Sequence, residues 1–132
     1  MNKLQLWFSS KSDLGLLIIR LFIGLRIIYG VFDNIISWNK MMEFADFLKA
    51  SGFPLPTLCA VVSVYAQFIC GVLILIGYKT RFAAFILAFN FIVAIVIVHL
   101  NDSIEVMSPA LAMLFISLGL LFTGAGKWVI EK

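Results

Sequence analysis

The chain has 132 residues, of which 63% are hydrophobic and 13% are charged, and its mean hydropathy is +1.09. So few charged residues cannot cover so apolar a core in water, which excludes an ordinary soluble domain and indicates a membrane protein. The formal net charge is +3, but the basic residues are scattered and accompany no nucleic-acid motif, so nucleic-acid binding is excluded. A single histidine and two cysteines also exclude a multi-histidine metal or haem site within one copy of the chain.

Long apolar segments follow one another along the sequence, and each is close to the ~20 residues that a helix needs to cross a bilayer. Their polarity does not alternate, which favours helices over a membrane β-barrel. We therefore expect a single all-α domain over residues 1–132, a bundle of four transmembrane helices at residues 14–36, 58–78, 82–100 and 110–129. Pro109 is expected to begin the last helix, and Gly124 and Gly126 are expected to lie at its end.

The connection between the first two spans carries a helical pattern of its own. Within Trp38–Ala50 the apolar residues recur with the spacing of one helical face, at Met41, Phe44, Ala45 and Leu48. Charged residues take the other positions, so the segment is predicted to be a short amphipathic helix on the outer membrane surface. Gly52, Pro54 and Pro56 then end this helix and turn the chain into the second span.

The basic residues outside the spans predict the orientation. Six lie on the side that carries both termini, namely Lys3, Lys11, Lys79, Arg81, Lys127 and Lys132, whereas Lys40 and Lys49 are the two on the other side. By the positive-inside rule, both termini are expected in the cytoplasm. Arg20 lies within the first span, and its side chain is expected to reach the cytoplasmic interface.

Polar residues within the spans are the candidates for a functional site. An ionisable group at the centre of a bilayer costs about 2.5–3.5 kcal/mol, so such groups face the bundle interior or a wet cavity. Arg26, Tyr29 and Asp33 share one face of the first span. At ~1.5 Å per residue, Gln67 lies at a depth similar to that of Arg26, and His99 ends the third span near the level of Asp33.

These depths predict a polar pocket that opens to the outer side of the membrane, formed by Arg26, Tyr29, Asp33, Gln67 and His99. Three interpretations remain open: a buried network that fixes helix register, a site for a ligand such as a quinone head group, and a contact with a partner subunit. The residues assign no catalytic group and no metal ligands.

Several short motifs resemble those of one family. They are Arg20-x-x-x-Gly24, Gly52-Phe53-Pro54-x-Pro56, Gln67-x-x-x-Gly71, Leu75-x-Gly77-x-x-Thr80-Arg81 and His99. In this order, over about residues 14–99, the chain resembles the DoxX/DoxD-like family of small bacterial membrane proteins. The resemblance implies a four-helix bundle in the bacterial inner membrane. It also implies a link to membrane oxidoreductases, since the family is named after subunits of a thiosulfate:quinone oxidoreductase.

The chain departs from the family pattern at Gln67, where many members carry Glu. A Glu side chain carries a proton, whereas Gln forms hydrogen bonds only. We therefore expect an accessory or anchoring subunit of a membrane oxidoreductase complex, bound to a membrane or periplasmic protein or to further copies of itself. The alternative is a quinone-interacting redox subunit with quinone as its cofactor. A small-molecule transporter is a minor third interpretation.

Overall fold

The computed structural model describes residues 2–97, 103–127 and 129, and within these ranges the chain is helical and contains no strand. The helices are α1 (Lys3–Ser9), α2 (Ser12–Ile36), α3 (Trp38–Ala50), α4 (Pro56–Ile76), α5 (Thr80–Ile97) and α6 (Ile104–Thr123). Four of them, α2, α4, α5 and α6, are long and apolar enough to cross a membrane. The prediction of an all-α membrane bundle is confirmed.

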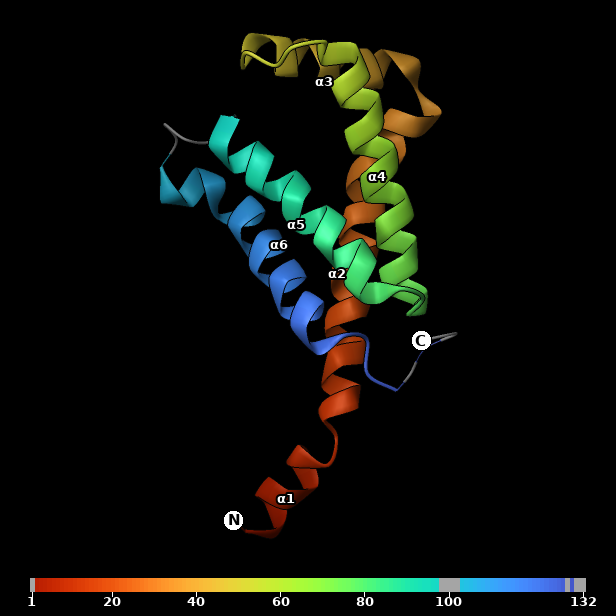
Figure 1. The fold of residues 1–132 in the computed structure, drawn as a ribbon, viewed down its shortest axis with the longest axis vertical. Helices are drawn as coiled ribbons and strands as arrows, with labels where there is room; N and C mark the ends of the chain where they lie inside the picture. Colours follow the sequence, from red (N-terminus) through yellow and green to blue (C-terminus); the bar gives the residue numbers. More distant parts are fainter. Residues whose placement is uncertain (1, 98–102, 128, 130–132) are drawn as a thin grey trace.

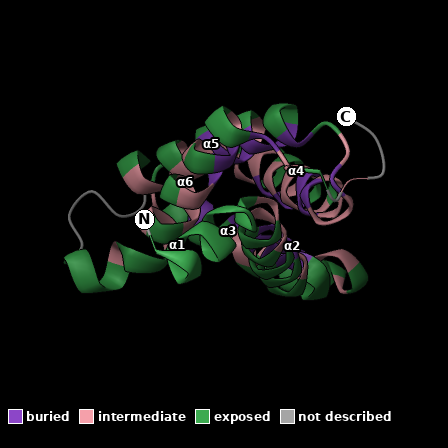
Figure 2. Ribbon diagram, turned by 90° about the horizontal axis from the view of Figure 1, so that it is seen from below, coloured by how far each residue is buried: buried purple, intermediate pink, exposed green. Residues whose placement is uncertain are grey.

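The long helices are packed as two pairs, which Figure 1 shows side by side. α2 packs along α4 and α5 packs along α6, while contact between α4 and α5 joins the pairs and α2 barely touches α6. The core at this junction consists of Ile23, Ile27, Cys70, Ile74, Ala83, Ala84, Leu87 and Leu120. Buried residues line the inner faces of the helices (Figure 2), and the outer faces expose large apolar side chains that suit contact with lipid.

α2 and α4 approach each other closely because each carries a glycine at the contact. A Cβ atom on Gly24 would lie 3.0 Å from the carbonyl oxygen of Gly71 and 3.0 Å from the Cβ of Leu75. A Cβ atom on Gly71 would lie 3.3 Å from the side chains of Ile27 and Ile28. Small residues that let two backbones meet are the usual way in which membrane helices associate. This contact fixes which face of α2 turns toward α4.

The helix predicted over Trp38–Ala50 is confirmed as α3, with the same bounds. Ser37 caps its start, since the Ser37 hydroxyl accepts a hydrogen bond from the backbone N–H of Lys40 at 3.4 Å. α3 lies across the ends of α2 and α4 (Figure 1) and buries Met41, Ala45 and Leu48. Pro56 then begins α4, as proline at the first helical position commonly does.

The bounds predicted for the fourth span are wrong. α6 begins at Ile104, where the Ser103 hydroxyl accepts a hydrogen bond from the backbone N–H of Val106 at 3.3 Å, so Pro109 lies inside the helix instead of starting it. α6 ends at Thr123 because Gly124 takes a φ of +72°, a left-handed value that breaks the helical path. Gly124 and Gly126 therefore belong to the segment that follows the helix.

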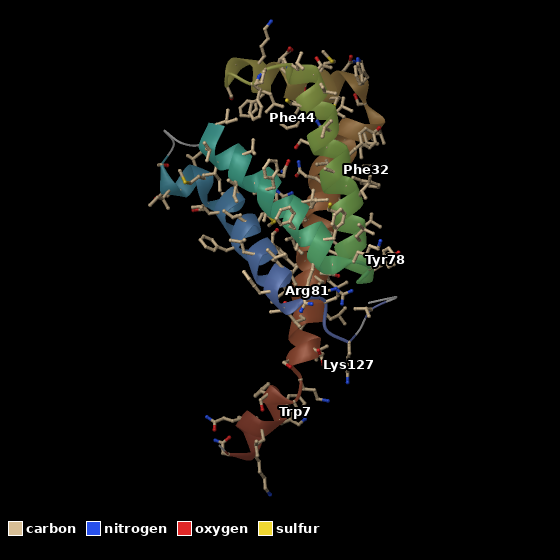
Figure 3. The ribbon with its side chains drawn as sticks, in the orientation of Figure 1. Trp7, Phe32, Phe44, Tyr78, Arg81 and Lys127 are labelled. Carbon is tan, nitrogen blue, oxygen red and sulfur yellow. The ribbon has the colours of Figure 1, made fainter. Side chains whose placement is uncertain are left out.

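α1 is a short helix that the pattern of the sequence does not predict. It extends away from the four long helices (Figure 1) and buries none of its residues. Asn2 and Gln5 form a capping box at its start, with the backbone N–H of Gln5 donating to the Asn2 side chain at 2.8 Å. Seven residues are too few for a periodic pattern to be recognised. Its exposed Leu4, Leu6, Trp7 and Phe8, of which Figure 3 labels Trp7, suit the membrane interface.

Candidate functional site

Of the five residues predicted to form one polar pocket, the four that the structure describes are not brought together. Arg26, Tyr29 and Asp33 lie on the exposed side of α2, and their side chains form no hydrogen bond or ion pair with the described residues. Gln67 lies on α4, is half-buried, and lines a cavity that none of these three residues reaches. His99 lies outside the described residues. The polar stripe on α2 and the polar group around Gln67 are thus two separate features.

The cavity at Gln67 lies below α3, between α4 and α5, and has a volume of about 410 Å³. α5 diverges from α4 toward α3 (Figure 1), and Phe44 projects from α3 toward the spans (Figure 3). Most of the wall is apolar, formed by Phe44, Phe47, Leu48, Phe53, Val62, Ala66, Ile86, Phe89, Phe91, Val93 and Ala94. Ligand sites typically have volumes of roughly 300–1,000 Å³ and mainly apolar walls, so this cavity has the size and lining of a small-molecule site.

Three polar side chains on the wall of the cavity are linked by hydrogen bonds. The Ser63 hydroxyl donates to the side-chain oxygen of Asn90 at 2.7 Å, and the Gln67 amide nitrogen donates to the Ser63 hydroxyl at 3.1 Å. Ser63 and Gln67 are four residues apart on α4 and therefore share a face of that helix, while Asn90 lies on α5. The chain of bonds ties the two helix pairs together in the middle of their membrane-spanning length.

This arrangement leaves hydrogen-bonding capacity at the cavity wall. The amide nitrogen of Asn90 and the amide oxygen of Gln67 have no hydrogen-bond partner among the described residues. One group is a donor and the other an acceptor. None of the lining residues that the structure describes is acidic, basic or a histidine. The cavity therefore suits an uncharged ligand that has an apolar body and a carbonyl or hydroxyl group.

Ser63 and Asn90 are the members of this site that the predicted pocket omitted. Two signals in the sequence pointed to them: the four-residue spacing of Ser63 and Gln67, and the position of Asn90 near the middle of the third span. Among the described residues, no group of three or more His, Cys, Asp or Glu side chains is placed to hold a metal ion.

Arg20 is buried, which corrects the expectation that its side chain reaches the membrane interface. It is 1% exposed. Its guanidinium donates through Nε to the carbonyl of Ile74 at 2.9 Å, through Nη2 to that of Leu75 at 3.1 Å, and through Nη1 to that of Ala125 at 3.2 Å. Ile74 and Leu75 lie in the last turn of α4, where the helix dipole is negative. The carbonyl of Ile74 also accepts from the backbone N–H of Gly77 at 3.2 Å. Arg20 thus caps α4 and ties the segment after α6 to it.

These features define a class of protein: a small polytopic membrane protein of four apolar helices, with a mainly apolar cavity between its two helix pairs. The family model of DoxX matches residues 15–100, a range that contains most of α2 and all of α3, α4 and α5. The chain belongs to the DoxX family, which confirms the resemblance seen in its motifs. The matched range includes Arg20 and the residues of the cavity. Neither the curated proteins nor the solved structures contain a match.

Proposed function

We propose that the chain is an accessory subunit of a membrane oxidoreductase complex and that its cavity below α3 holds the ring of a quinone. The observation that carries this proposal is the linked group of Ser63, Gln67 and Asn90 on the wall of an otherwise apolar cavity. A quinone carbonyl accepts a hydrogen bond from the Asn90 amide nitrogen, and a hydroxyl of the reduced form donates to the Gln67 amide oxygen. The aromatic and aliphatic walls contact the ring and the start of the tail.

The chemistry of these side chains supports a subunit over a free-standing enzyme. A bound quinone supplies two-electron redox chemistry, whereas the chain's own residues at the cavity bind and orient it. Side-chain amides do not take up or release protons near neutral pH. Among the described residues, the cavity lining contains no acidic, basic or histidine side chain to move a proton. The protons and electrons therefore come from another subunit, as expected for a member of a complex.

Binding of short-chain quinones tests the proposal directly. The full chain in mild detergent is titrated with a short-chain benzoquinone and with a short-chain naphthoquinone, and the bound fraction is measured by equilibrium dialysis. Saturable binding near one molecule per chain is expected. Asn90→Leu and Gln67→Leu should each weaken it by about tenfold, which corresponds to one lost hydrogen bond. Gln5→Leu is the matched control, because Gln5 lies on α1 and outside the cavity.

Two results would contradict the quinone site. One is the absence of saturable binding to the wild-type chain by either quinone. The other is an affinity in both Asn90→Leu and Gln67→Leu that equals that of Gln5→Leu. Melting temperatures of all the variants in the same detergent serve to separate lost binding from lost folding.

A second function, anchoring of another membrane protein, is favoured by the stripe of Arg26, Tyr29 and Asp33 on α2. These residues are exposed on a helix that is apolar enough to span the membrane. An arginine that faces lipid at mid-membrane costs about 2.5–3.5 kcal/mol, and a protein partner that offers acceptors removes this cost. A partner found at constant stoichiometry after mild extraction should be lost in Arg26→Leu and retained in Phe22→Leu, an apolar change on the exposed part of α2. Purified wild-type chain that turns over substrate without any partner would contradict the anchoring function.

The proposed location is the bacterial inner membrane, with both termini in the cytoplasm. Its support is the excess of Lys and Arg at the end of the helices where the chain begins. In this orientation the quinone cavity lies in the outer half of the membrane, next to α3.

A further inference from the structure

A second cavity lies at the other end of the molecule from α3. It has a volume of about 590 Å³ and is bounded by the start of α2, the turn between α4 and α5, and the segment after α6. Figure 3 shows Arg81 and Lys127 at this end, where α5 begins and α6 ends. Neither the quinone cavity nor the stripe on α2 includes any of its lining residues.

Among the described residues, the charges that line this cavity are mainly positive. Lys79, Arg81 and Lys127 contribute three cations, and Asp13 contributes one carboxylate. The Arg81 guanidinium donates through Nη2 to the carbonyl of Phe122 at 3.4 Å, which holds it against the end of α6. Space for it depends on Gly124, where a Cβ atom would lie 3.3 Å from the Arg81 Nε. The Arg81 guanidinium is thus held beside the end of α6, whereas the side chains of Lys79 and Lys127 are exposed.

Neutral hydrogen-bond donors lie in the same cavity wall. Thr80 is the first residue of α5, and the first N–H groups of a helix have no acceptor within that helix and lie at the positive end of its dipole. The Thr80 side chain indicates a ligand independently of the cations. The residue is 5% exposed, and its hydroxyl has no hydrogen-bond partner in the described part of the chain. A buried hydroxyl without a partner destabilises the fold unless a ligand supplies the missing hydrogen bond.

We propose that this cavity binds the phosphate group of an anionic ligand. Phosphate oxygens accept hydrogen bonds from the Arg81 guanidinium, from the ammonium groups of Lys79 and Lys127, and from the start of α5. The cavity lies at the ends of the membrane-spanning helices, at the level of lipid head groups. The shared chemistry is a phosphate ester, which either a phospholipid or a dissolved phosphate compound supplies.

The test measures lipid binding to the full chain in neutral detergent. Phosphatidylglycerol and diacylglycerol with the same acyl chains differ in the phosphate head group, and native mass spectrometry counts the molecules retained by each chain. The expected result is retention of phosphatidylglycerol and not of diacylglycerol. The double variant Arg81→Gln with Lys127→Gln should bind phosphatidylglycerol about 30-fold more weakly, since each cation near a membrane surface contributes about fivefold.

The matched control is Lys40→Gln with Lys49→Gln, which makes the same change in charge on exposed positions of α3. It should leave the affinity within about twofold of the wild type. Thr80→Val retains every charge and should weaken binding by about threefold to tenfold, which keeps the proposal testable if the double variant does not fold. Equal retention of the two lipids, or equal losses in the two double variants, would overturn the proposal.

Competition identifies the source of the phosphate group. If dissolved glycerol phosphate displaces phosphatidylglycerol, the site recognises the phosphate ester itself, and the natural ligand can be soluble. If phosphatidylglycerol binds and glycerol phosphate does not displace it, the ligand is a lipid head group. Both results support the phosphate site, because each requires the cations that line the cavity.

Discussion

Replacement of Arg20 by methionine tests the role of the most deeply buried charge among the described residues. Arg20→Met removes at least three hydrogen bonds, to the carbonyls of Ile74, Leu75 and Ala125, while an unbranched side chain of similar length retains most of the packing. Each hydrogen bond to a charged group contributes about 1.5–3 kcal/mol. The desolvation of the buried cation offsets part of this sum, so the net loss of stability is expected to be about 3–5 kcal/mol.

The assay is reversible unfolding with an anionic detergent in mixed micelles, followed by tryptophan fluorescence. Arg26→Met is the matched control, because Arg26 lies on the same helix, is exposed, and forms no hydrogen bond with the described residues. Its effect is expected to stay within about 1 kcal/mol of the wild type. Arg20→Lys should fall between the two, since an ammonium retains the charge but cannot reach three carbonyls in fixed directions.

One result would refute this reasoning: a free energy of unfolding for Arg20→Met that equals that of Arg26→Met. The carbonyls at the end of α4 would then be satisfied without the guanidinium. If Arg20→Lys loses as much stability as Arg20→Met, the planar guanidinium with its several donors stabilises the fold, and a positive charge alone does not.

Three further predictions use simple assays. Gly24→Ala should lower the free energy of unfolding by about 1–3 kcal/mol, because the added methyl group crowds α4. Gly119→Ala places nothing within 4 Å of the added atom and should raise the free energy of unfolding by about 0.5–1 kcal/mol. The same unfolding assay compares the two variants, and equal effects would argue against the close approach of α2 and α4. Ser117→Ala should raise stability by about 1 kcal/mol, because the Ser117 hydroxyl is buried without a partner among the described residues; a fall in the midpoint would mean that the hydroxyl is satisfied. A periplasmic phosphatase reporter should be active when inserted after Ser51 and inactive when fused to Lys132, and the reverse pattern would overturn the orientation.

The elements that the sequence predicted well are those with a clear periodic pattern. The spacing of Met41, Ala45 and Leu48 located α3 exactly, because an amphipathic helix repeats its apolar face whatever lies around it. The fourth span was misplaced because apolar residues continue past its true end. A left-handed φ at Gly124 ends α6, and hydropathy does not record backbone angles.

The candidate site was predicted in part, for a geometric reason. Counting residues along a span gives the depth of a side chain, and it placed Gln67 in the middle of the membrane. The same counting does not show how each helix is rotated about its axis. The contact of Gly24 with Gly71 sets that rotation for α2 and leaves Arg26 on the exposed side, away from Gln67. The partners of Arg20 are backbone carbonyls, which no pattern of side chains reveals.

The hydrogen bonds of Arg20 also set an order for biogenesis. The carbonyl of Ile74 lies 54 residues downstream of Arg20 and that of Ala125 lies 105 residues downstream. At roughly 5–20 residues per second, the ribosome needs about 3–10 s after Arg20 to make the first of them. Until then the nascent first span carries two arginines without these acceptors, which makes its transfer into lipid less favourable. We expect α2 to complete insertion together with α4, as a hairpin. A nascent chain that stops before α4 should remain sensitive to extraction by alkali.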